Sequence, residues 1–291
     1  MSALDSEQLA TLAAVVQEGS FDAAARALHV TPSAVSQRIK SLEQDVGQVL
    51  VRRAKPCRAT DAGRPLLRLA GQIALLEREA LAEARGAPAT RVAMVANGDS
   101  LATWFLPALA ALPPHVLVDV RVEDQDHTAE LLRDGTVMAA VTSQPEAVQG
   151  CRVERLGAMR YVAVVAPVLA ARAFPDGPAP AALAAAPVIL VDRRDGLQHQ
   201  FAQKLGLRRP DPPVHYVQSV WGFCDAIRLG LGWGMMPEQL AAPDLAAGRL
   251  VELAPGRSLD VPLHWQHWRL DSTVLAALTE AVRAAAREAL R

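Results

Sequence analysis

One face of the segment 32–46 carries side chains that suit contacts with nucleic acid. They are two hydroxyls, two amides and one cation, with no acid among them: Ser33, Ser36, Gln37, Lys40 and Gln44. Amides and hydroxyls can hydrogen-bond to base edges in the major groove, and a lysine can contact phosphate. A solvated surface helix would usually carry Glu–Lys pairs on such a face. These residue types therefore indicate recognition of double-stranded DNA.

A second group of polar residues follows the predicted strands in the later part of the chain. Acids, hydroxyls and aromatic rings stand at four strand ends, in the segments 97–104, 123–126, 142–145 and 218–225. Two of these segments also begin helices, whose free backbone N–H groups attract anions. Each segment alone has the composition of an ordinary cap or turn. Together they suit a small zwitterion with a cationic tail, such as lysine or arginine.

The elements that must position the polar helix have the pattern of a helix-turn-helix. Thr31 and Pro32 predict the start of the helix, because threonine caps free N–H groups and proline fits the first helical position. Alanine- and leucine-rich helices are expected at 6–18 and 22–28, which completes a three-helix core. Such helix pairs also occur in all-α domains that bind no DNA. The buried stripe of the polar helix is expected to consist of Val35, Ile39, Leu42 and Val46.

The charge of this region favours a surface that faces phosphates. From Arg26 to Arg68 the chain holds nine Lys or Arg residues and three acids, a net charge of +6, whereas the whole chain carries −1. Four of these cations lie in the run 50–58, which is expected to form a basic wing beside the helices. Clustered positive charge is the electrostatic footprint of nucleic-acid binding.

The run FDAAARALHVTPSAVSQRIKSLE, at 21–43, resembles the N-terminal domain of LysR-type transcriptional regulators. The match continues without a gap through Gly47, Leu50, Arg53, Thr60 and Gly63. Val51 departs from the pattern, because the family often has phenylalanine there. The resemblance implies an all-α winged helix-turn-helix that binds a promoter or operator.

The resemblance also implies which residues contact DNA. Base edges or the groove would be contacted by Pro32, Ser33, Ser36 and Gln37. Arg53 on the wing would reach phosphate or the minor groove, and Lys40 joins the set by its place on the polar face. Members of the family form homodimers or homotetramers and act on RNA polymerase at the promoter. Both are therefore expected partners.

A long amphipathic helix is expected at 61–85, with Thr60 as its cap. Its apolar residues repeat every three or four positions: Leu66, Leu69, Ile73, Leu76 and Ala80. This seam suits packing on its own domain or pairing with a second copy, and its place behind a DNA-binding module favours the dimer. The predicted domains are 1–60, a winged helix-turn-helix; 61–89, a linker helix with a hinge at 86–89; and 90–291, an effector-binding domain.

Strands alternate with helices from Arg91 onward, which predicts an α/β domain with mostly parallel sheets. The β-rich runs are 92–96, 116–122, 137–141, 161–166, 188–191 and 214–217. In such sheets ligands bind beyond the carboxyl ends of the strands, where helix N-termini point. The four polar segments described above stand at such ends.

Four runs resemble the ArgP/LysG branch of the LysR family, whose members sense basic amino acids: NGDSLATWFLPAL, VEDQDHTAELLRDG, VTSQPEAVQGC and LGLGWGMMPE. Gly98 departs from the alanine that is usual in the branch. The resemblance implies a two-lobed effector domain like a periplasmic binding protein, with lobe one at 90–165 and 265–291 and lobe two at 166–264. It implies lysine, arginine or histidine as the effector, and control of amino-acid export or biosynthesis genes. A regulator that responds to a different small carboxylate is the alternative.

The resemblance also assigns the two ends of the effector. Its carboxylate is expected near the hydroxyl groups of Ser100, Thr103 and Thr142. Its amine or guanidinium is expected near the acids Asp99, Glu123 or Asp124. The other predicted effector-binding residues flank these positions: Leu101, Trp104, Ser219 and Phe223.

Other chemistry is not indicated by the sequence. The glycine-rich run 230–234 follows a helix and lacks Gly-Lys-Ser/Thr, which predicts a turn into a strand and no phosphate loop. His264 and His267 alternate with two tryptophans, which favours packing over metal binding. The sequence shows no motif that pairs a nucleophile with a general base, which a hydrolytic enzyme would require. We therefore expect a protein that is no enzyme and binds no metal or cofactor besides its small-molecule effector.

Composition indicates a cytoplasmic protein that does not enter the membrane. No run of eighteen apolar residues occurs, and the N-terminus has no secretory pattern. A transport binding protein of similar fold would need such a signal, and it would give no role to the Arg-rich first ninety residues. Cys57, Cys151 and Cys224 lack metal-ligand spacing, and isolated thiols are favoured over a Cys57–Cys224 redox switch.

Overall fold

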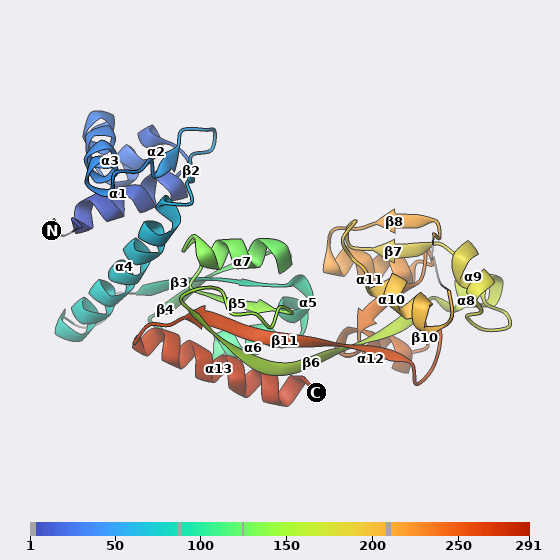
Figure 1. The fold of residues 1–291 in the computed structure, drawn as a ribbon. Coiled ribbons are helices and arrows are strands. Elements are labelled where there is room, and N and C mark those ends of the chain that lie inside the picture. Colours follow the sequence, from blue (N-terminus) through green and yellow to red (C-terminus); the bar gives the residue numbers. More distant parts are fainter. Residues whose placement is uncertain (1–3, 86–88, 124, 208–210) are drawn as a thin grey trace. The chain divides into compact units, whose positions relative to one another are not determined.

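The computed structural model describes residues 4–85, 89–123, 125–207 and 211–291. The chain divides into two compact units, whose elements are labelled in Figure 1. Unit 1 consists of Met1–Asn97, Ala108–Glu154 and His264–Val282, and unit 2 of Gly98–Pro107, Arg155–Leu263 and Arg283–Arg291. None of the helices in the described ranges combines the length and the apolar composition that a membrane span requires. Most of the predicted hinge, residues 86–88, lies outside these ranges.

Three helices and a short hairpin form the N-terminal part of unit 1 (Figure 1). They are α1 (Ser6–Gln17), α2 (Phe21–Ala27), α3 (Pro32–Val46), β1 (Val51–Arg52) and β2 (Arg58–Ala59). Three residues of the predicted stripe of α3, Val35, Ile39 and Leu42, lie in one core cluster with apolar residues of α1, and the fourth, Val46, is partly buried against it. The Thr31 hydroxyl accepts a hydrogen bond from the backbone N–H of Ala34 at 3.2 Å. The predicted start of this helix is therefore confirmed.

A carboxylate at the end of α3 fixes the wing to the helix. Glu43 Oε1 accepts hydrogen bonds from the backbone N–H groups of Leu50 at 2.8 Å and Val51 at 3.4 Å. Between Glu43 and Leu50 the chain turns at Gly47, whose φ of +73° is in the left-handed region that glycine adopts without strain. The wing strand therefore begins at a position set by the polar helix.

The long helix α4 (Gly63–Arg85) follows, and Thr60 caps it as predicted, since its hydroxyl accepts from the N–H of Gly63 at 3.1 Å. The predicted seam is divided between two environments. Its first residues, Leu66, Leu69 and Ile73, pack against the core of the N-terminal helices. Further along, Leu76 is 40% exposed and Ala80 is also exposed.

A different side of α4 packs on the sheet of unit 1. Arg68 donates a hydrogen bond to the carbonyl of Gln149 at 3.0 Å, and Gly71 admits the Trp268 ring, which would lie 2.8 Å from a Cβ there. The Glu79 carboxylate accepts from the Ser272 hydroxyl at 2.6 Å and from the Val274 N–H at 3.0 Å. Glu79 therefore caps the start of α13 (Thr273–Ala289).

Three parallel strands of unit 1 form one end of the large sheet. They are β3 (Thr90–Ala96), β4 (Val116–Val122) and β5 (Ala139–Thr142), with α7 (Gln125–Arg133) between the last two. β3 pairs in parallel with both neighbours, and β11 (Ser258–Trp268) pairs antiparallel with β5. The ring nitrogen of Trp265 donates to Thr279 at 3.1 Å, which joins β11 to α13 within the core.

Unit 2 contains most of β6 (Cys151–Val165), which pairs antiparallel with β9 (Gly234–Pro237) and β10 (Val251–Glu252). A separate parallel pair is formed by β7 (Val188–Leu190) and β8 (Val214–Tyr216). The helices of the unit are α5 (Gly98–Ser100), a π-helical turn η1 (Leu101–Phe105), α8 (Pro167–Ala173), α9 (Pro180–Ala185), α10 (Leu197–Lys204), α11 (Val220–Arg228) and α12 (Glu238–Ala246). A short helix α6 (Leu106–Ala110) leads back to unit 1.

The expectation of mostly parallel sheets is wrong for the large sheet. β11 against β5, and β6 against β9 and β10, are antiparallel. β6 also begins at Cys151, ten residues before the predicted start, because its charged first half hides the strand pattern. Both β6 and β11 run from one unit to the other. The turn predicted at 230–234 is confirmed, since Gly230 has a φ of +76° and β9 starts at Gly234.

The unit boundaries differ from the predicted lobes at three segments. The segments 98–107, 155–165 and 283–291 belong to unit 2, whereas the sequence placed them in lobe one. A hydrogen bond joins the first two of these segments, from the Tyr161 hydroxyl to the Asp99 carboxylate. This contact ties the start of the helical segment to β6.

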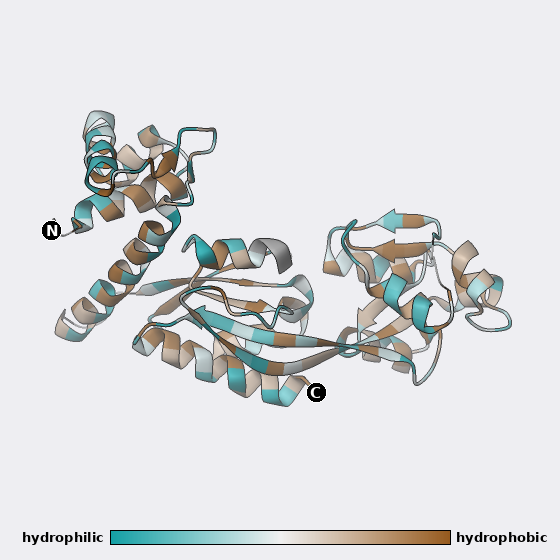
Figure 2. Ribbon diagram, viewed as in Figure 1, coloured by the Kyte–Doolittle hydropathy of each residue, from teal (hydrophilic) through white to brown (hydrophobic). Residues whose placement is uncertain are grey.

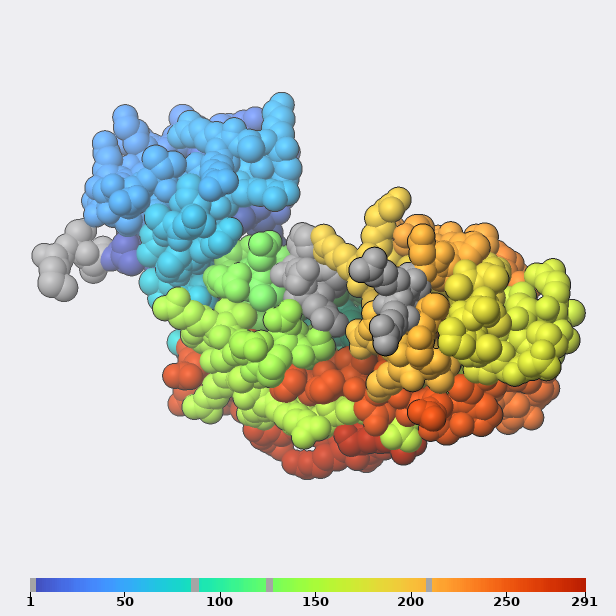
Figure 3. All heavy atoms as spheres, turned by 45° about the vertical axis from the view of Figure 1, so that its right-hand side comes forward, coloured from blue at the N-terminus to red at the C-terminus, as the bar shows by residue number. Residues whose placement is uncertain are grey.

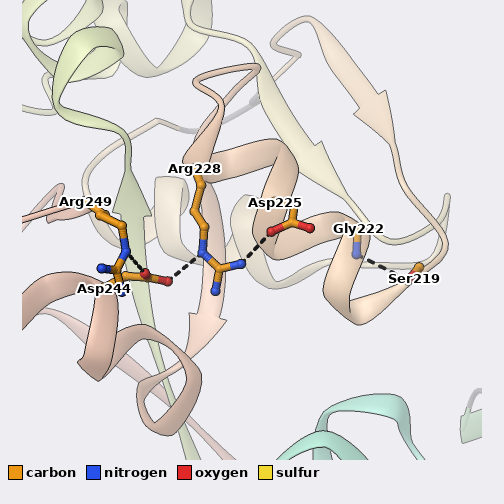
Figure 4. Close-up of polar contacts among 6 residues, drawn as sticks. All are labelled: Ser219, Gly222, Asp225, Arg228, Asp244 and Arg249. Carbon is orange, nitrogen blue, oxygen red and sulfur yellow. Dashed lines mark hydrogen bonds and ion pairs between the residues drawn. The ribbon is translucent and has the colours of Figure 1, made fainter. Parts of the chain in front are cut away.

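A buried carboxylate joins the helices of unit 2. Asp244 on α12 accepts from Arg228 Nε of α11 at 2.7 Å and from Arg249 Nε at 2.6 Å, and Arg228 also pairs with Asp225 at 2.6 Å (Figure 4). Burial alone would raise the pKa of Asp244, but the hydrogen bonds from the two guanidinium groups outweigh it and lower this pKa.

We expect Asp244→Asn to destabilise the folded protein by about 1–3 kcal/mol at pH 7, measured by urea denaturation. This is below the value for a fully buried pair, because the Arg228 and Arg249 side chains are 31% and 57% exposed. Because the pKa of Asp244 is lower in the folded state, its charge stabilises the fold at any pH above its unfolded-state pKa. This stabilisation is lost as the pH falls through its folded-state pKa. The difference should therefore shrink below about pH 4.

The matched control for this prediction is Asp260→Asn. Asp260 pairs with Arg160 at 2.8 Å, and both side chains are substantially exposed. Its loss should cost less than about 1 kcal/mol. Equal costs for the two substitutions would contradict the structural role of Asp244.

Candidate DNA-binding and effector-binding residues

The polar face of α3 is open to solvent. Pro32, Ser33, Gln37 and Lys40 are exposed and Ser36 is half-buried. The Ser33 hydroxyl lies 2.9 Å from that of Thr31, which places it at the start of the helix. Figure 2 shows hydrophilic residues along α3, and Figure 3 shows the N-terminal helices and the wing as one surface in blue. The predicted DNA-binding residues of α3 are therefore brought to one accessible face.

The cations of this region are not equivalent. Arg38 pairs with Glu7 at 2.8 Å and Arg64 with Asp61 at 3.2 Å, so their charges are partly compensated. The exposed guanidinium of Arg53 lies over the Phe21 ring, 4.9 Å from its centroid. Such a cation–π contact holds the guanidinium while its N–H groups stay available. This arrangement suits the phosphate or minor-groove contact that the sequence predicted for Arg53.

The carboxyl ends of two strands in unit 1, β4 and β5, carry predicted effector residues. Glu123 follows β4 and is exposed, and Thr142 ends β5 and is 4% exposed. The Thr142 hydroxyl accepts from the N–H of Gln144 at 3.1 Å. Because β3 pairs in parallel with β4 and β5, these ends meet at one edge of the sheet. Asp124 lies outside the described residues.

A residue that sequence reasoning missed supports the loop after Thr142. Gln266 on β11 is 2% exposed, and its Oε1 accepts from the N–H of Val148 at 3.0 Å. Its Nε2 donates to the carbonyls of Gln144 at 3.3 Å and Glu146 at 2.8 Å. The available signal was a polar amide between Trp265 and His267, in the run 265–268 that ends β11.

Five predicted effector residues lie on one helical segment of unit 2, formed by α5 and η1. They are Asp99, Ser100, Leu101, Thr103 and Trp104. Ser100 and Trp104 are buried, and the Thr103 hydroxyl donates to the carbonyl of Asp99 at 2.6 Å. The segment 97–104 has the composition of an ordinary cap, but neither Asp99 nor Ser100 acts as one. Ser100 makes no side-chain capping bond, and Asp99 lies within the first turn and faces Tyr161.

Tyr161 is the second residue that sequence reasoning missed. It is 3% exposed, and its hydroxyl donates to Asp99 Oδ2 at 2.7 Å. Burial raises the pKa of Asp99, the tyrosine hydrogen bond opposes this, and the like charge of Asp195 adds to the rise. Burial also raises the pKa of Tyr161 well above its usual value. The phenol is therefore the proton donor in this pair.

Asp195 belongs to the loop before α10, and backbone groups hold it. Its carboxylate accepts from the N–H groups of Val191 at 3.1 Å and Leu197 at 3.3 Å, and from Gln198 Nε2 at 3.2 Å. Burial raises its pKa and these hydrogen bonds oppose the rise. Asp195 thus acts on Asp99 through its charge, while its own oxygens serve the loop.

The two predicted residues at the start of α11 differ in exposure. Ser219 is exposed and caps the helix, since its hydroxyl accepts from the N–H of Gly222 at 3.3 Å (Figure 4). Phe223 is 4% exposed and lies in a core cluster with Val162 and Met236. A Cβ at Gly234 would lie 2.7 Å from the Phe223 ring, so this ring fills the core of unit 2.

Other features do not coincide with the predicted sites. A cavity of about 610 Å³ in unit 1 is lined by α1, α4 and the sheet, and no predicted effector residue lines it. The three cysteines are buried and free, and burial raises the pKa of Cys151 and Cys224 to about 11. In the described part of the chain no three His, Cys, Asp or Glu residues gather as metal ligands would.

Comparison with known proteins covers both halves of the chain. Residues 6–64 match the family described as bacterial regulatory helix-turn-helix protein, lysR family, and residues 85–291 match the LysR substrate binding domain. The chain is 43% identical over 292 residues to the lysine export transcriptional regulatory protein LysG of Corynebacterium glutamicum, with 98% of both proteins covered.

Two solved structures are similar over their whole length. The crystal structure of ArgP from Mycobacterium tuberculosis has a TM-score of 0.92 and 56% identity, with 99% of both chains covered. Full-length LysG from Corynebacterium glutamicum with bound effector Arg has a TM-score of 0.82 and 41% identity, with 99% of this chain and 100% of that chain covered. The similarity to the ArgP/LysG branch that the sequence indicated is thus confirmed, and the chain belongs to the LysR family of bacterial helix-turn-helix regulatory proteins.

Proposed function

We propose that this protein regulates transcription by binding double-stranded DNA through α3 and the wing, and that a basic amino acid controls this binding. The observation that carries the proposal is the arginine bound to the Corynebacterium glutamicum relative, which this chain matches over nearly its whole length. Lysine and arginine are the proposed effectors. Genes for export or synthesis of basic amino acids are the proposed targets, in line with the name of the lysine export regulator.

The chemistry of the candidate residues supports a cationic effector. Two of the predicted effector residues are acids with described side chains: Asp99, which is half-buried and accepts a hydrogen bond from Tyr161, and Glu123, which is exposed. The hydroxyl groups of Ser100, Thr103 and Thr142 are proposed for the carboxylate end. In this proposal these groups bind the ligand without converting it, and the ligand dissociates chemically unchanged.

The effector acts through linkage. A ligand shifts an equilibrium only by its different affinity for two arrangements of the protein, and the coupling between ligand and DNA is reciprocal. We propose a homodimer, or a homotetramer built from it, in which the exposed end of the α4 seam at Leu76 and Ala80 pairs with a second copy. DNA as the target places the protein in the cytoplasm, where RNA polymerase is the proposed partner at the promoter.

The DNA-binding assignment predicts two different effects on α3. Gln37→Ala should reduce the preference for the operator over unrelated DNA, because it removes a base-reading amide, by about 1–3 kcal/mol. Lys40→Ala should weaken binding to both DNAs alike and lower the salt slope of log K by about 1. Gel retardation or fluorescence anisotropy at several salt concentrations measures both quantities.

The matched control is Lys204→Ala, which removes an exposed lysine from α10 of unit 2. It should leave operator affinity and the salt slope unchanged. If Lys40→Ala behaves like this control, α3 does not face phosphate and the proposed DNA-binding surface is wrong.

The effector assignment predicts that lysine or arginine raises the melting temperature of the protein, because a ligand that binds only the folded form stabilises it. Glu123→Gln should weaken binding of both amino acids by roughly tenfold in calorimetry, the order expected for one charge-assisted hydrogen bond. Glu130→Gln, which removes an exposed acid from α7, should leave this affinity unchanged. Wild-type protein that binds no basic amino acid would overturn the sensing proposal.

A further inference from the structure

Tyr161 is held in a fixed place before any ligand is considered. It lies on β6 opposite Pro237 of β9, in an antiparallel ladder that also pairs Val162 with Met236. Its ring is buried, and its hydroxyl donates to Asp99 at 2.7 Å. A buried phenol needs a hydrogen-bond partner, and a strand inside a paired ladder cannot turn to offer another. Tyr161 therefore determines where one carboxylate oxygen of Asp99 lies.

The surroundings of Asp99 are acidic or neutral. The groups that shift its pKa are Tyr161 from β6 and Asp195 from the loop before α10. From α11, the Cys224 thiol also faces Asp99, and its pKa of about 11 keeps it neutral at pH 7. None of these groups is a cation. This differs from Asp244 in the same unit, which has a guanidinium on each oxygen.

A carboxylate in this setting has acceptor capacity left over. An ionised carboxylate offers about four lone pairs on two oxygens, and Tyr161 uses one of them on Oδ2. The hydrogen bond also favours the charged form of Asp99 against its burial. A cationic ligand would supply a positive charge that none of the described groups acting on Asp99 provides.

We propose that Tyr161 is a positioning residue for effector recognition, which orients the Asp99 carboxylate so that it accepts a hydrogen bond from the guanidinium or ammonium of a basic amino acid. This inference rests on the proposed function and deepens it. Asp195 contributes through its negative charge, because backbone and amide donors already occupy its oxygens. Tyr161 is thus a determinant of charge selectivity, although it touches Asp99 and not the ligand.

The test compares arginine with citrulline, a neutral amino acid of nearly the same shape, by calorimetry over a range of pH. Wild-type protein should bind arginine more tightly, and this preference should fall as the pH decreases through the pKa of Asp99. Tyr161→Phe should weaken arginine binding by roughly tenfold and citrulline binding by much less. It should also move the pH at which arginine affinity falls to a higher value, because the lost donor stabilised the charged carboxylate.

The chain offers a matched control in Tyr216, its other tyrosine. Tyr216 is 45% exposed and lies beneath Arg193 in unit 2, with 5.1 Å between the guanidinium carbon and the ring centroid. Tyr216→Phe should change neither the arginine affinity nor its pH midpoint. A merely structural role for Tyr161 would lower the affinity for both ligands alike and leave the midpoint in place.

The outcomes separate this inference from the proposed function. If wild-type protein binds no basic amino acid, the proposed function fails. If it binds arginine, and Tyr161→Phe keeps both the affinity and the pH midpoint, only the role of Tyr161 fails. Asp99→Asn, which keeps a partner for the phenol, decides the question should Tyr161→Phe not fold. It should remove the preference for arginine over citrulline, and an unchanged preference would overturn the inference.

Discussion

A carboxylate that leaves water loses a large hydration energy, which only hydrogen bonds and an opposite charge can replace. Unit 2 contains two such groups with different partners. Asp244 accepts from two guanidinium groups, which lower its pKa and make it a joint between helices. Asp99 accepts from one phenol, and burial raises its pKa; none of the described groups that shift this pKa is a cation. The charge of Asp244 is therefore neutralised by side chains of the fold, and for Asp99 we propose that a cationic ligand does this.

In unit 1 the helix α4 contacts both the N-terminal DNA-binding helices and the sheet region. One side of α4 packs against the core of the N-terminal helices through Leu66, Leu69 and Ile73. Another side contacts the sheet region through Arg68, Gly71 and Glu79. Because Glu79 also caps α13, a displacement of the start of α13 would change the hydrogen bonds of α4. Control of DNA binding by an effector needs a rigid element of this kind, which both sites can bias.

The DNA-binding part could be predicted closely from the sequence because its determinants are local. Thr31 caps a helix three residues away, and the stripe of α3 follows from helical spacing alone. The effector half was predicted less completely. Tyr161 and Asp99 are 62 positions apart, and Gln266 supports a loop about 120 positions away. Such pairs depend on strand register, which was not available because the charged first half of β6 concealed where that strand begins. Asp99 consequently resembled an ordinary cap.

The geometry at Asp99 also bears on which basic amino acids can be accepted. Tyr161 uses one lone pair of Oδ2, so acceptor sites remain on both oxygens of Asp99. These sites can accept the two parallel hydrogen bonds of a guanidinium. An ammonium can also donate a charge-assisted hydrogen bond to either oxygen. Neutral side chains are disfavoured, because they leave a half-buried negative charge without a counter-ion beside Asp195. In the proposed role Asp99 thus selects for positive charge and not for one amino acid, and discrimination between lysine and arginine must come from other residues.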